Sequence, residues 1–272
     1  MRLEKNISES YNEVIKIGGS VLKTYGHYTQ IAKKIKTYVK TNSFQSLYVV
    51  VSARKGRTDQ LINNLLICQE ERKYIDDILN NEVTRPEFNE VYDDPFIASY
   101  LLQGEINSAK RLSSKLKEEG IDAALLLQGS EFPIIANSSY LYASIDNINS
   151  MQRFNNNMPK NKVVVISGFG AENTNGEKVL LGKNASDLVA ALIGFFDRAV
   201  RKVIYLKDVD GIYSAFNTDK QKIIPEISRH DLLKSNFGKV LDKRTLYYQK
   251  CNYLVQNENK ELGSNGTIIR NF

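Results

Sequence analysis

Short apolar runs typical of buried strands alternate along the whole chain with segments in which apolar residues recur at helical spacing. The first two runs, Val14–Ile17 and Leu47–Val51, are each followed by a loop and a helical pattern, and later runs are Ala123–Leu127, Val163–Ser167 and Lys202–Leu206. Strands that are apolar on both faces are typical of parallel sheets, because helices cover such sheets on both sides. The chain is therefore expected to be an α/β protein, a three-layer αβα sandwich around a mainly parallel open sheet.

The first apolar run leads directly into two glycines and a serine. The segment Val14-Ile-Lys-Ile-Gly-Gly-Ser20 precedes a helical pattern between Thr29 and Lys40. Glycines have no Cβ, so backbone N–H groups can approach a phosphate closely, and Lys16 can place a positive charge beside it. No Gly-Lys-Ser/Thr follows at Walker spacing. An ordinary strand-to-helix turn with a solvated lysine explains these residues equally well at this point.

Polar residues also follow the second apolar run, in Ser52-Ala-Arg-Lys-Gly-Arg-Thr58, where Thr58 is expected to be a helix N-cap. The hydroxyls of Ser52 and Thr58 either cap and turn the chain or line a ligand pocket at the carboxyl ends of the strands. Glu105 follows Gly104, where a helix is expected to begin and to run to Lys117. A carboxylate there suits an ammonium ligand, although interaction with the helix dipole alone is the favoured interpretation.

The second half of the chain repeats this organisation. Leu181-Gly-Lys-Asn-Ala-Ser-Asp187 precedes the apolar helix Leu188–Phe196, with Ser186 as the expected N-cap. A helix that begins in this way offers phosphate-binding amides and a carboxylate in one place. Lys207-Asp-Val-Asp-Gly-Ile-Tyr213 follows the next strand, and its two aspartates share a face of an extended chain. Because Asp-Gly is a turn signal, a turn is favoured over a metal site, and no metal site is expected.

Composition narrows the classes of function. The chain has 272 residues, 42% of them hydrophobic and 25% charged, enough for one large or two small domains. No apolar run approaches the ~20 residues of a membrane span, and the N-terminus lacks the apolar core of a signal peptide, so a cytoplasmic location is expected. Cys68 and Cys251 are isolated, which argues against a disulfide framework or a zinc site. The net charge of +6 is spread along the chain and favours a small anionic substrate over nucleic acid.

Several motifs resemble, in the same order, those of the catalytic domain of aspartokinases in the amino acid kinase family. Lys16–Ser20 resembles Lys-Phe-Gly-Gly-Thr, Val50–Ile62 resembles Val-Val-Ser-Ala-Met-x-Gly-x-Thr-Asx-x-Leu-Ile, and Gly104–Ala109 resembles Gly-Glu-x-x-Ser-Ala. The segment Asp208–Tyr213 is nearly unchanged, and Phe237–Thr245 together with Gly266–Ile268 resembles the closing segment of that domain. The resemblance therefore extends from residue 14 to residue 268.

The resemblance implies an amino acid kinase-like fold and ATP-dependent phosphorylation of the side-chain carboxylate of L-aspartate, giving 4-phospho-L-aspartate and ADP. Mg²⁺ would arrive with ATP, held mainly by phosphate oxygens and water. Lys16 and Asp187 would be the catalytic residues. The amino acid would be held by Ser52, Thr58, Glu105, Lys183 and Ser186, with Glu105 on its ammonium group. The nucleotide and its phosphates would be held by Gly18, Gly19, Ser20, Lys207, Asp208, Tyr213 and Lys239.

The loop Gly182–Asp187 departs from the family's Gly-Arg-Gly-Gly-Ser-Asp. Lys183 stands where an arginine is usually assigned to the substrate carboxylate, and Asn184 and Ala185 replace two glycines. The Pro-Arg that usually follows the Tyr213 region is also missing. Two alternatives therefore stay open: a kinase of another small acidic or amino-acid substrate in the same family, and a ligand-binding homologue without turnover.

The resemblance also predicts how the chain is organised. The chain ends at Phe272, where aspartokinases usually continue into regulatory ACT domains, so a single catalytic domain over residues 1–272 without an ACT domain is expected. The polar, Asn-rich segment Arg153–Lys162 predicts a boundary between an N-lobe (1–158) for the amino acid and a C-lobe (159–272) for the nucleotide. The expected partners are an amino acid and a nucleotide, with no nucleic acid and no membrane. A homodimer is left open.

Overall fold

The computed structural model describes residues 10–65, 67–82, 92–129, 132–214, 218, 221–235 and 240–271. Its largest sheet has eight strands in the order β10-β12-β11-β7-β1-β2-β4-β3. All neighbouring strands in it are parallel except the antiparallel pair of β11 and β12. The mainly parallel sheet predicted from the apolar runs is confirmed. The strands are β1 (Asn12–Ile17), β2 (Ser46–Val51), β3 (Ala123–Leu126), β4 (Val163–Ser167), β7 (Val200–Lys207), β10 (Glu226–Ser228), β11 (Asn252–Asn257) and β12 (Thr267–Arg270).

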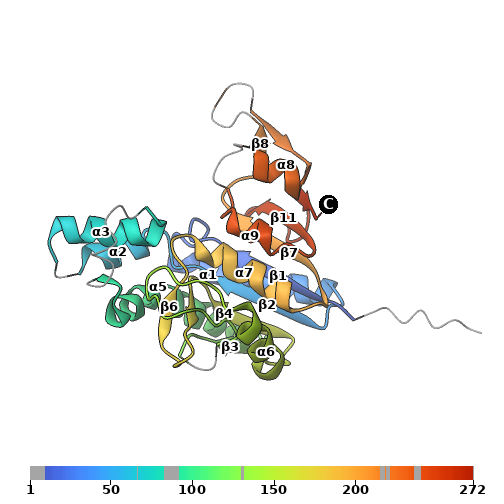
Figure 1. Ribbon diagram of the computed structural model, residues 1–272. Helices are drawn as coiled ribbons and strands as arrows, with labels where there is room; N and C mark the ends of the chain where they lie inside the picture. The colour runs from blue at the N-terminus through green and yellow to red at the C-terminus, as the bar shows by residue number, and fades with distance from the viewer. Residues whose placement is uncertain are drawn as a thin grey trace, which may run out of the picture.

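Helices cover both faces of this sheet, as Figure 1 shows for α1 and α7. The helices are α1 (Tyr25–Thr41), α2 (Arg57–Asn63), α3 (Gln69–Asn80), α5 (Pro95–Glu118), α6 (Asn147–Asn157), α7 (Ala185–Phe196), α8 (Arg229–Lys234) and α9 (Arg244–Tyr247). Two short antiparallel hairpins stand outside the main sheet: β5 (Gly170–Glu172) with β6 (Lys178–Leu180), and β8 (Ile212–Ser214) with β9 (Lys222–Ile224). The three-layer αβα prediction is confirmed.

The alternation of side chains along β1 decides which core each residue enters. Ile15 and Ile17 pack with α1 and the second half of α5, whereas Val14 packs on the opposite face with α7. Lys16 shares the face of Val14, because successive side chains of a strand point to opposite sides. A slip of one residue in register would move the Lys16 ammonium into the apolar core beneath α1 and take it away from Asp187, while Ile15 and Ile17 would enter the α7 side.

Three predicted helix starts are wrong. Gly56, with φ +73°, precedes α2, so Thr58 lies inside the first turn of that helix and is not its N-cap. Asn184, with φ +64°, precedes α7, so Ser186 is likewise inside the helix. Helix α5 begins at Pro95, where the Asp94 carboxylate accepts hydrogen bonds from the N–H groups of the first turn. Glu105 therefore lies in the middle of this helix, far from its dipolar end.

The predicted division at residues 158 and 159 stays a prediction. Strand β4, which follows it in sequence, is inserted between β2 and β3 from the first half of the chain. The sheet is therefore continuous across this position. Within the described residues, no helix is both long enough and apolar enough to cross a membrane.

Candidate active site

Most of the predicted site residues meet in one cavity of about 330 Å³ at the carboxyl ends of β1, β2 and β7. Parallel strands place their carboxyl ends at the same sheet edge, so residues distant in sequence converge there. The predicted residues that line this cavity are Lys16, Gly18, Gly19, Ser20, Ser52, Thr58, Glu105, Lys183, Ser186, Asp187 and Lys207. Their convergence is observed, whereas their individual roles stay predictions.

Asp187, in the first turn of α7, lies between two lysine ammonium groups. Its Oδ1 is 2.7 Å from Nζ of Lys16, and its Oδ2 is 2.7 Å from Nζ of Lys207. Burial alone would raise the pKa of Asp187, but the two positive charges outweigh it and lower that pKa to about 2. The carboxylate is therefore ionised at every physiological pH and holds both ammonium groups at the wall of the cavity.

The Lys16 ammonium is almost completely buried, with 6% of its side chain exposed. Burial lowers the pKa of Lys16 to about 8, although Asp187 acts in the opposite direction. A charge in this setting interacts strongly with an incoming anion, because little water screens it. Lys16 is thus a cation held in place before any phosphate arrives.

Glu105 presents a buried carboxylate to the same cavity from the interior of α5. The residue is 4% exposed, and its Oε2 has no hydrogen-bond partner in the described part of the chain. Burial raises the pKa of Glu105 to about 8, against smaller opposing effects of backbone hydrogen bonds and of Lys16. An unsatisfied buried carboxyl oxygen is costly, and an ammonium ligand would satisfy it. The helix can approach this closely because a Cβ on Gly104 would stand 2.9 Å from the Cβ of Ala53.

Gly19 is packed against the loop after β2 so tightly that it has no room for a side chain. A Cβ at this position would lie 2.6 Å from the carbonyl oxygen of Ala53, a backbone atom that cannot rotate away. The two loops that form the cavity floor are thereby held at a fixed separation. This contact explains why a glycine stands after Gly18.

Gly19→Ala is expected to destabilise the protein by about 1–3 kcal/mol, as overpacking typically does, and to reduce phosphate binding by moving the loop. Chemical denaturation measures the first effect, and nucleotide titration measures the second. Gly26→Ala is the matched control, because a Cβ there would stand 3.7 Å from the Thr24 hydroxyl oxygen, an ordinary contact. Equal stability of the two variants would contradict the packing argument.

Lys183, the residue in place of the expected arginine, is already paired. Its Nζ lies 2.7 Å from Oδ1 of Asp76 on α3 and 4.0 Å from Oδ1 of Asp59 on α2. Both partners are partly exposed, so the pairs are weak and could be exchanged for a ligand carboxylate. Asn184 adopts a left-handed conformation with φ +64°, which asparagine tolerates better than most residues. The loss of that glycine therefore does not prevent the loop from turning into α7.

Other predicted residues lie apart from this cavity. Asp208 and Tyr213 do not line it, and the Tyr213 hydroxyl donates a hydrogen bond of 3.4 Å to Asp210. Lys239 lies outside the described residues. Over the ranges that the structure covers, no group of three or more His, Cys, Asp or Glu side chains is placed to hold a metal ion.

The sequence interpretation missed several residues that line the cavity, namely Arg54, Lys55, Phe169 and Asn184. Arg54 and Lys55 stand inside the Ser52–Thr58 motif, so their two positive charges could have been noticed there. Phe169 lies between two glycines and has φ +70°, an uncommon conformation for a bulky residue. No sequence signal predicts that conformation.

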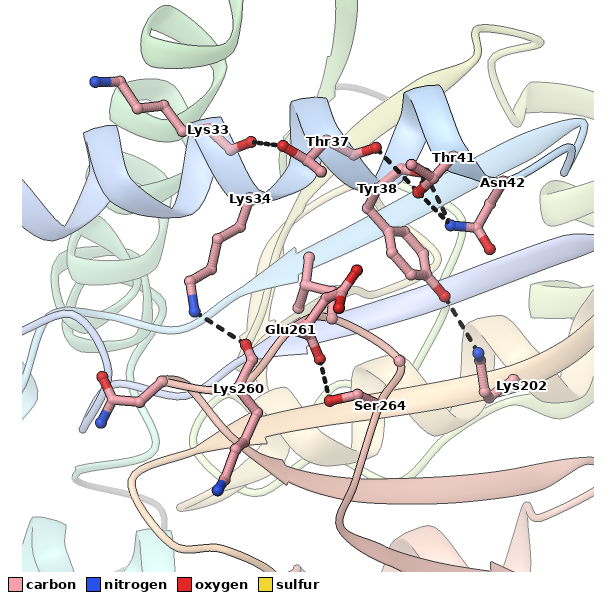
Figure 2. Close-up of a pocket in the computed structure, with 13 residues that line it drawn as sticks. Lys33, Lys34, Thr37, Tyr38, Thr41, Asn42, Lys202, Lys260, Glu261 and Ser264 are labelled. Carbon is pink, nitrogen blue, oxygen red and sulfur yellow. Dashed lines mark hydrogen bonds between the residues drawn. The ribbon is translucent and has the colours of Figure 1, made fainter.

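A second cavity, of about 630 Å³, lies between α1 and the loop after β11 and contains none of the predicted residues. Figure 2 shows that its Lys34 donates a hydrogen bond of 3.0 Å to the Lys260 carbonyl and that Lys202 donates one of 3.2 Å to the Tyr38 hydroxyl. Lys202 also lies 3.4 Å from the buried Glu13 carboxylate. These lysines therefore hold α1 against the sheet.

Comparisons with known proteins agree with this geometry. A model of the amino acid kinase family matches residues 13–256. The aspartokinase of Helicobacter pylori J99 is 30% identical over 261 residues, which cover 94% of this chain and 58% of that protein. The aspartokinase of Rickettsia bellii is 28% identical over 227 residues, covering 84% of this chain and 49% of that protein. The chain thus spans roughly half of the length of these relatives.

Solved structures show the same fold. Escherichia coli aspartokinase III, crystallised in complex with aspartate and ADP, superposes with a TM-score of 0.74 at 20% identity. The match covers 94% of this chain and 64% of that chain.

Proposed function

The chain belongs to the amino acid kinase family, and we propose that it catalyses ATP-dependent phosphorylation of the side-chain carboxylate of L-aspartate. The products are 4-phospho-L-aspartate and ADP. The observation that carries this proposal is the juxtaposition, in one cavity, of the buried Lys16–Asp187–Lys207 cluster with the unpaired carboxyl oxygen of Glu105. The cluster suits a transferring phosphoryl group, and Glu105 suits the ammonium group of an amino acid. The aspartokinases among the relatives support the choice of aspartate.

In the proposed reaction, a side-chain carboxylate oxygen of aspartate attacks the γ-phosphorus of ATP. A new O–P bond forms while the bond from that phosphorus to the β,γ-bridging oxygen breaks, and ADP leaves with the electron pair. Catalysis of such a transfer depends on positioning and on positive charge, with little covalent work for the protein. Lys16 and the amide of Gly19 stabilise the transferring group, and Asp187 holds Lys16 in place. The Gly18 N–H already donates a hydrogen bond of 3.0 Å to the Leu206 carbonyl, so Gly18 lines the phosphate site without donating to it.

The remaining predicted residues complete the two substrate sites. Ser52, Thr58, Lys183 and Ser186 hold the amino acid with Glu105. Ser20, Lys207, Asp208, Tyr213 and Lys239 hold the nucleotide. Mg²⁺ enters with ATP, held mainly by phosphate oxygens and water, because Asp187 is already engaged by two lysines.

The proposal is tested by trapping acyl phosphate with hydroxylamine in reactions that contain ATP, Mg²⁺ and one member of a panel of amino and dicarboxylic acids. Hydroxamate formation with L-aspartate above all other panel members is the expected result. Turnover with a different acidic compound, and not with L-aspartate, would show that this compound is the substrate. Nucleotide or amino-acid binding without any product would instead identify a ligand-binding homologue.

Asp76→Asn is expected to lower the KM for aspartate by about two- to fivefold, since it frees Lys183 to bind the substrate carboxylate. Surface pairs of this kind contribute up to about 1 kcal/mol, which limits the effect. Lys183→Arg is expected to lower the same KM further, because a guanidinium fork can grip a carboxylate with two parallel hydrogen bonds. Steady-state kinetics measure both. An unchanged KM in both variants would show that Lys183 does not bind the substrate carboxylate.

A further inference from the structure

A hollow of about 720 Å³ adjoins the candidate active site on the side of α1 and α5. We call it the basic hollow, and its principal lining residues are Tyr25, Arg54, Arg57, Ser108, Lys110 and Arg111. These residues come from the start of α1, the loop after β2, the first residue of α2 and the middle of α5. The basic hollow is larger than the candidate active-site cavity, and most of the charged side chains that line it are positive.

Four cations of the basic hollow have no acidic partner in the described part of the chain, namely Arg54, Arg57, Lys110 and Arg111. A fifth lining cation, Lys115, lies 2.6 Å from Oε2 of Glu118. By contrast, Lys202 and Lys183, which line the two other cavities described above, each lie close to a carboxylate. Like charges at close quarters repel each other, so this arrangement is stabilised by a bound anion.

The walls of the basic hollow are suited to phosphate groups. The guanidinium groups of Arg54 and Arg111 lie 5.3 and 4.0 Å from the centre of the Tyr25 ring, which restricts their motion. Planar guanidinium groups bind phosphate through paired hydrogen bonds. A hydrogen bond of 2.8 Å joins the Tyr28 and Ser108 hydroxyls, and both residues are almost fully buried. The hollow thus combines fixed cationic donors with a polar floor.

We propose that the basic hollow binds a small polyanion that carries two or more phosphate groups. These four cations, which have no acidic partner among the described residues, carry more positive charge than a single phosphate neutralises, and the volume leaves room for a second phosphate group. The site is distinct from the candidate active site, although Arg54 lines both. An anion in the hollow draws the Arg54 guanidinium toward itself and lowers the positive potential at the active-site cavity.

Inorganic tripolyphosphate is the probe, titrated calorimetrically into the full chain in the presence of excess ADP, which occupies the nucleotide site. The expected result is one tripolyphosphate site whose affinity falls at least tenfold in the double variant Lys110→Gln/Arg111→Gln. Both side chains are exposed, so the variant is expected to fold. The matched control is Lys33→Gln/Lys260→Gln, which removes two positive charges from the cavity of Figure 2 and is expected to change the affinity less than twofold.

If the affinity for tripolyphosphate falls equally in the two double variants, the binding depends only on the overall positive charge of the protein, and the proposal is overturned. Absence of stoichiometric binding to the parent chain would also overturn it. Tighter binding of a ten-residue polyglutamate peptide than of tripolyphosphate would identify a protein-docking surface instead of a small-anion site.

A second readout concerns the shared Arg54 and rests on the proposed kinase activity. Saturating tripolyphosphate is expected to raise the KM for aspartate at least twofold in the parent chain, and less in Lys110→Gln/Arg111→Gln. An unchanged KM despite calorimetric binding would overturn the link between the two sites. If the chain has no kinase activity, the calorimetric comparison still decides whether the basic hollow binds the anion.

Discussion

Lys16→Ala is expected to reduce kcat for acyl phosphate formation by about 10²–10³, while the protein remains folded. Removing one preorganised donor from a developing negative charge typically has an effect of this size. The Lys16 ammonium is held 2.7 Å from Asp187 in a nearly water-free position, so a substituting water cannot reproduce its field. Rapid-quench measurement of product formation gives kcat, and circular dichroism reports whether the fold persists. Asp187 retains Lys207 as a partner in this variant, which limits the loss of stability.

Lys202→Ala is the matched control for this experiment. Lys202 also lies in the main sheet and beside a buried carboxylate, that of Glu13, but it faces the cavity of Figure 2. Its removal is expected to lower stability and to leave kcat within about twofold of the parent value. Comparable losses of kcat in the two variants would show that Lys16 acts only through folding, and the catalytic role would have to be withdrawn.

Glu105→Gln is expected to raise the KM for aspartate by about 10- to 100-fold and, at pH 8–9, to raise the melting temperature of the ligand-free protein. A hydrogen bond to a charged group contributes about 1.5–3 kcal/mol, and each 1.4 kcal/mol is a tenfold change in affinity. Steady-state kinetics and thermal unfolding measure the two effects. Because the variant is expected to bind aspartate more weakly and yet to be more stable, a loss of structure cannot explain the higher KM.

The sign of the stability effect follows from the raised pKa. Burial raises the pKa of Glu105 to about 8 in the folded protein, from an ordinary value of 4.5. Between these values the folded state binds the extra proton, so the stability that this proton confers is lost as pH rises from about 4.5 to about 8. Glutamine is neutral at all pH values and escapes this loss. The melting temperatures of parent and variant are therefore expected to diverge with rising pH.

Glu13→Gln is the matched control for Glu105. Glu13 is equally buried, but it accepts a hydrogen bond of 2.6 Å from Tyr38 and lies beside Lys202, away from the candidate active site. Its neutralisation is expected to lower the melting temperature and leave the KM for aspartate unchanged. A lower melting temperature of Glu105→Gln above pH 8 would contradict the assignment of an unpaired carboxylate.

The same titration predicts a pH dependence of kcat/KM. Below pH 8 most free enzyme has a protonated Glu105, which cannot pair with an ammonium group, so kcat/KM is expected to rise as pH approaches 8. Lys16 also has a pKa of about 8, so its charge is lost above that value and kcat/KM falls again. A bell-shaped profile centred near pH 8 is the expected result, and its rising limb should vanish in Glu105→Gln.

Local patterns in the sequence were sufficient to predict the main architecture, and the resemblance to aspartokinases supplied most of the residues of the cavity lining. Apolar runs such as Val14–Ile17 identify buried parallel strands, and the carboxyl ends of such strands meet at one edge. Lys16 follows this rule, because it stands at the end of β1, whereas Asp187, 171 positions later, enters the site from α7 behind the β5–β6 hairpin and was assigned from the resemblance.

Features that depend on contacts between distant segments were not predicted. Gly104 was interpreted as lying at a helix start. In the folded protein α5 continues through it, although glycine lowers helix propensity, because its missing Cβ makes room for Ala53. The pairing of Lys183 with Asp76 joins residues 107 positions apart and has no local signal. The same holds for the basic hollow, whose cations come from separate segments.

The position of β1 between β2 and β7 has a consequence for synthesis of the protein. Lys16 pairs with Val50 on one side and with Tyr205 on the other, so the strand that carries it is completed only when residues near 205 are available. While the ribosome translates the intervening segment, the nascent chain presents one unpaired, apolar edge of β1. Such edges associate readily with other chains, and long-range parallel pairing forms slowly. The sheet position that gives Lys16 its buried setting therefore also leaves one edge of β1 without its partner strand until β7 has been synthesised.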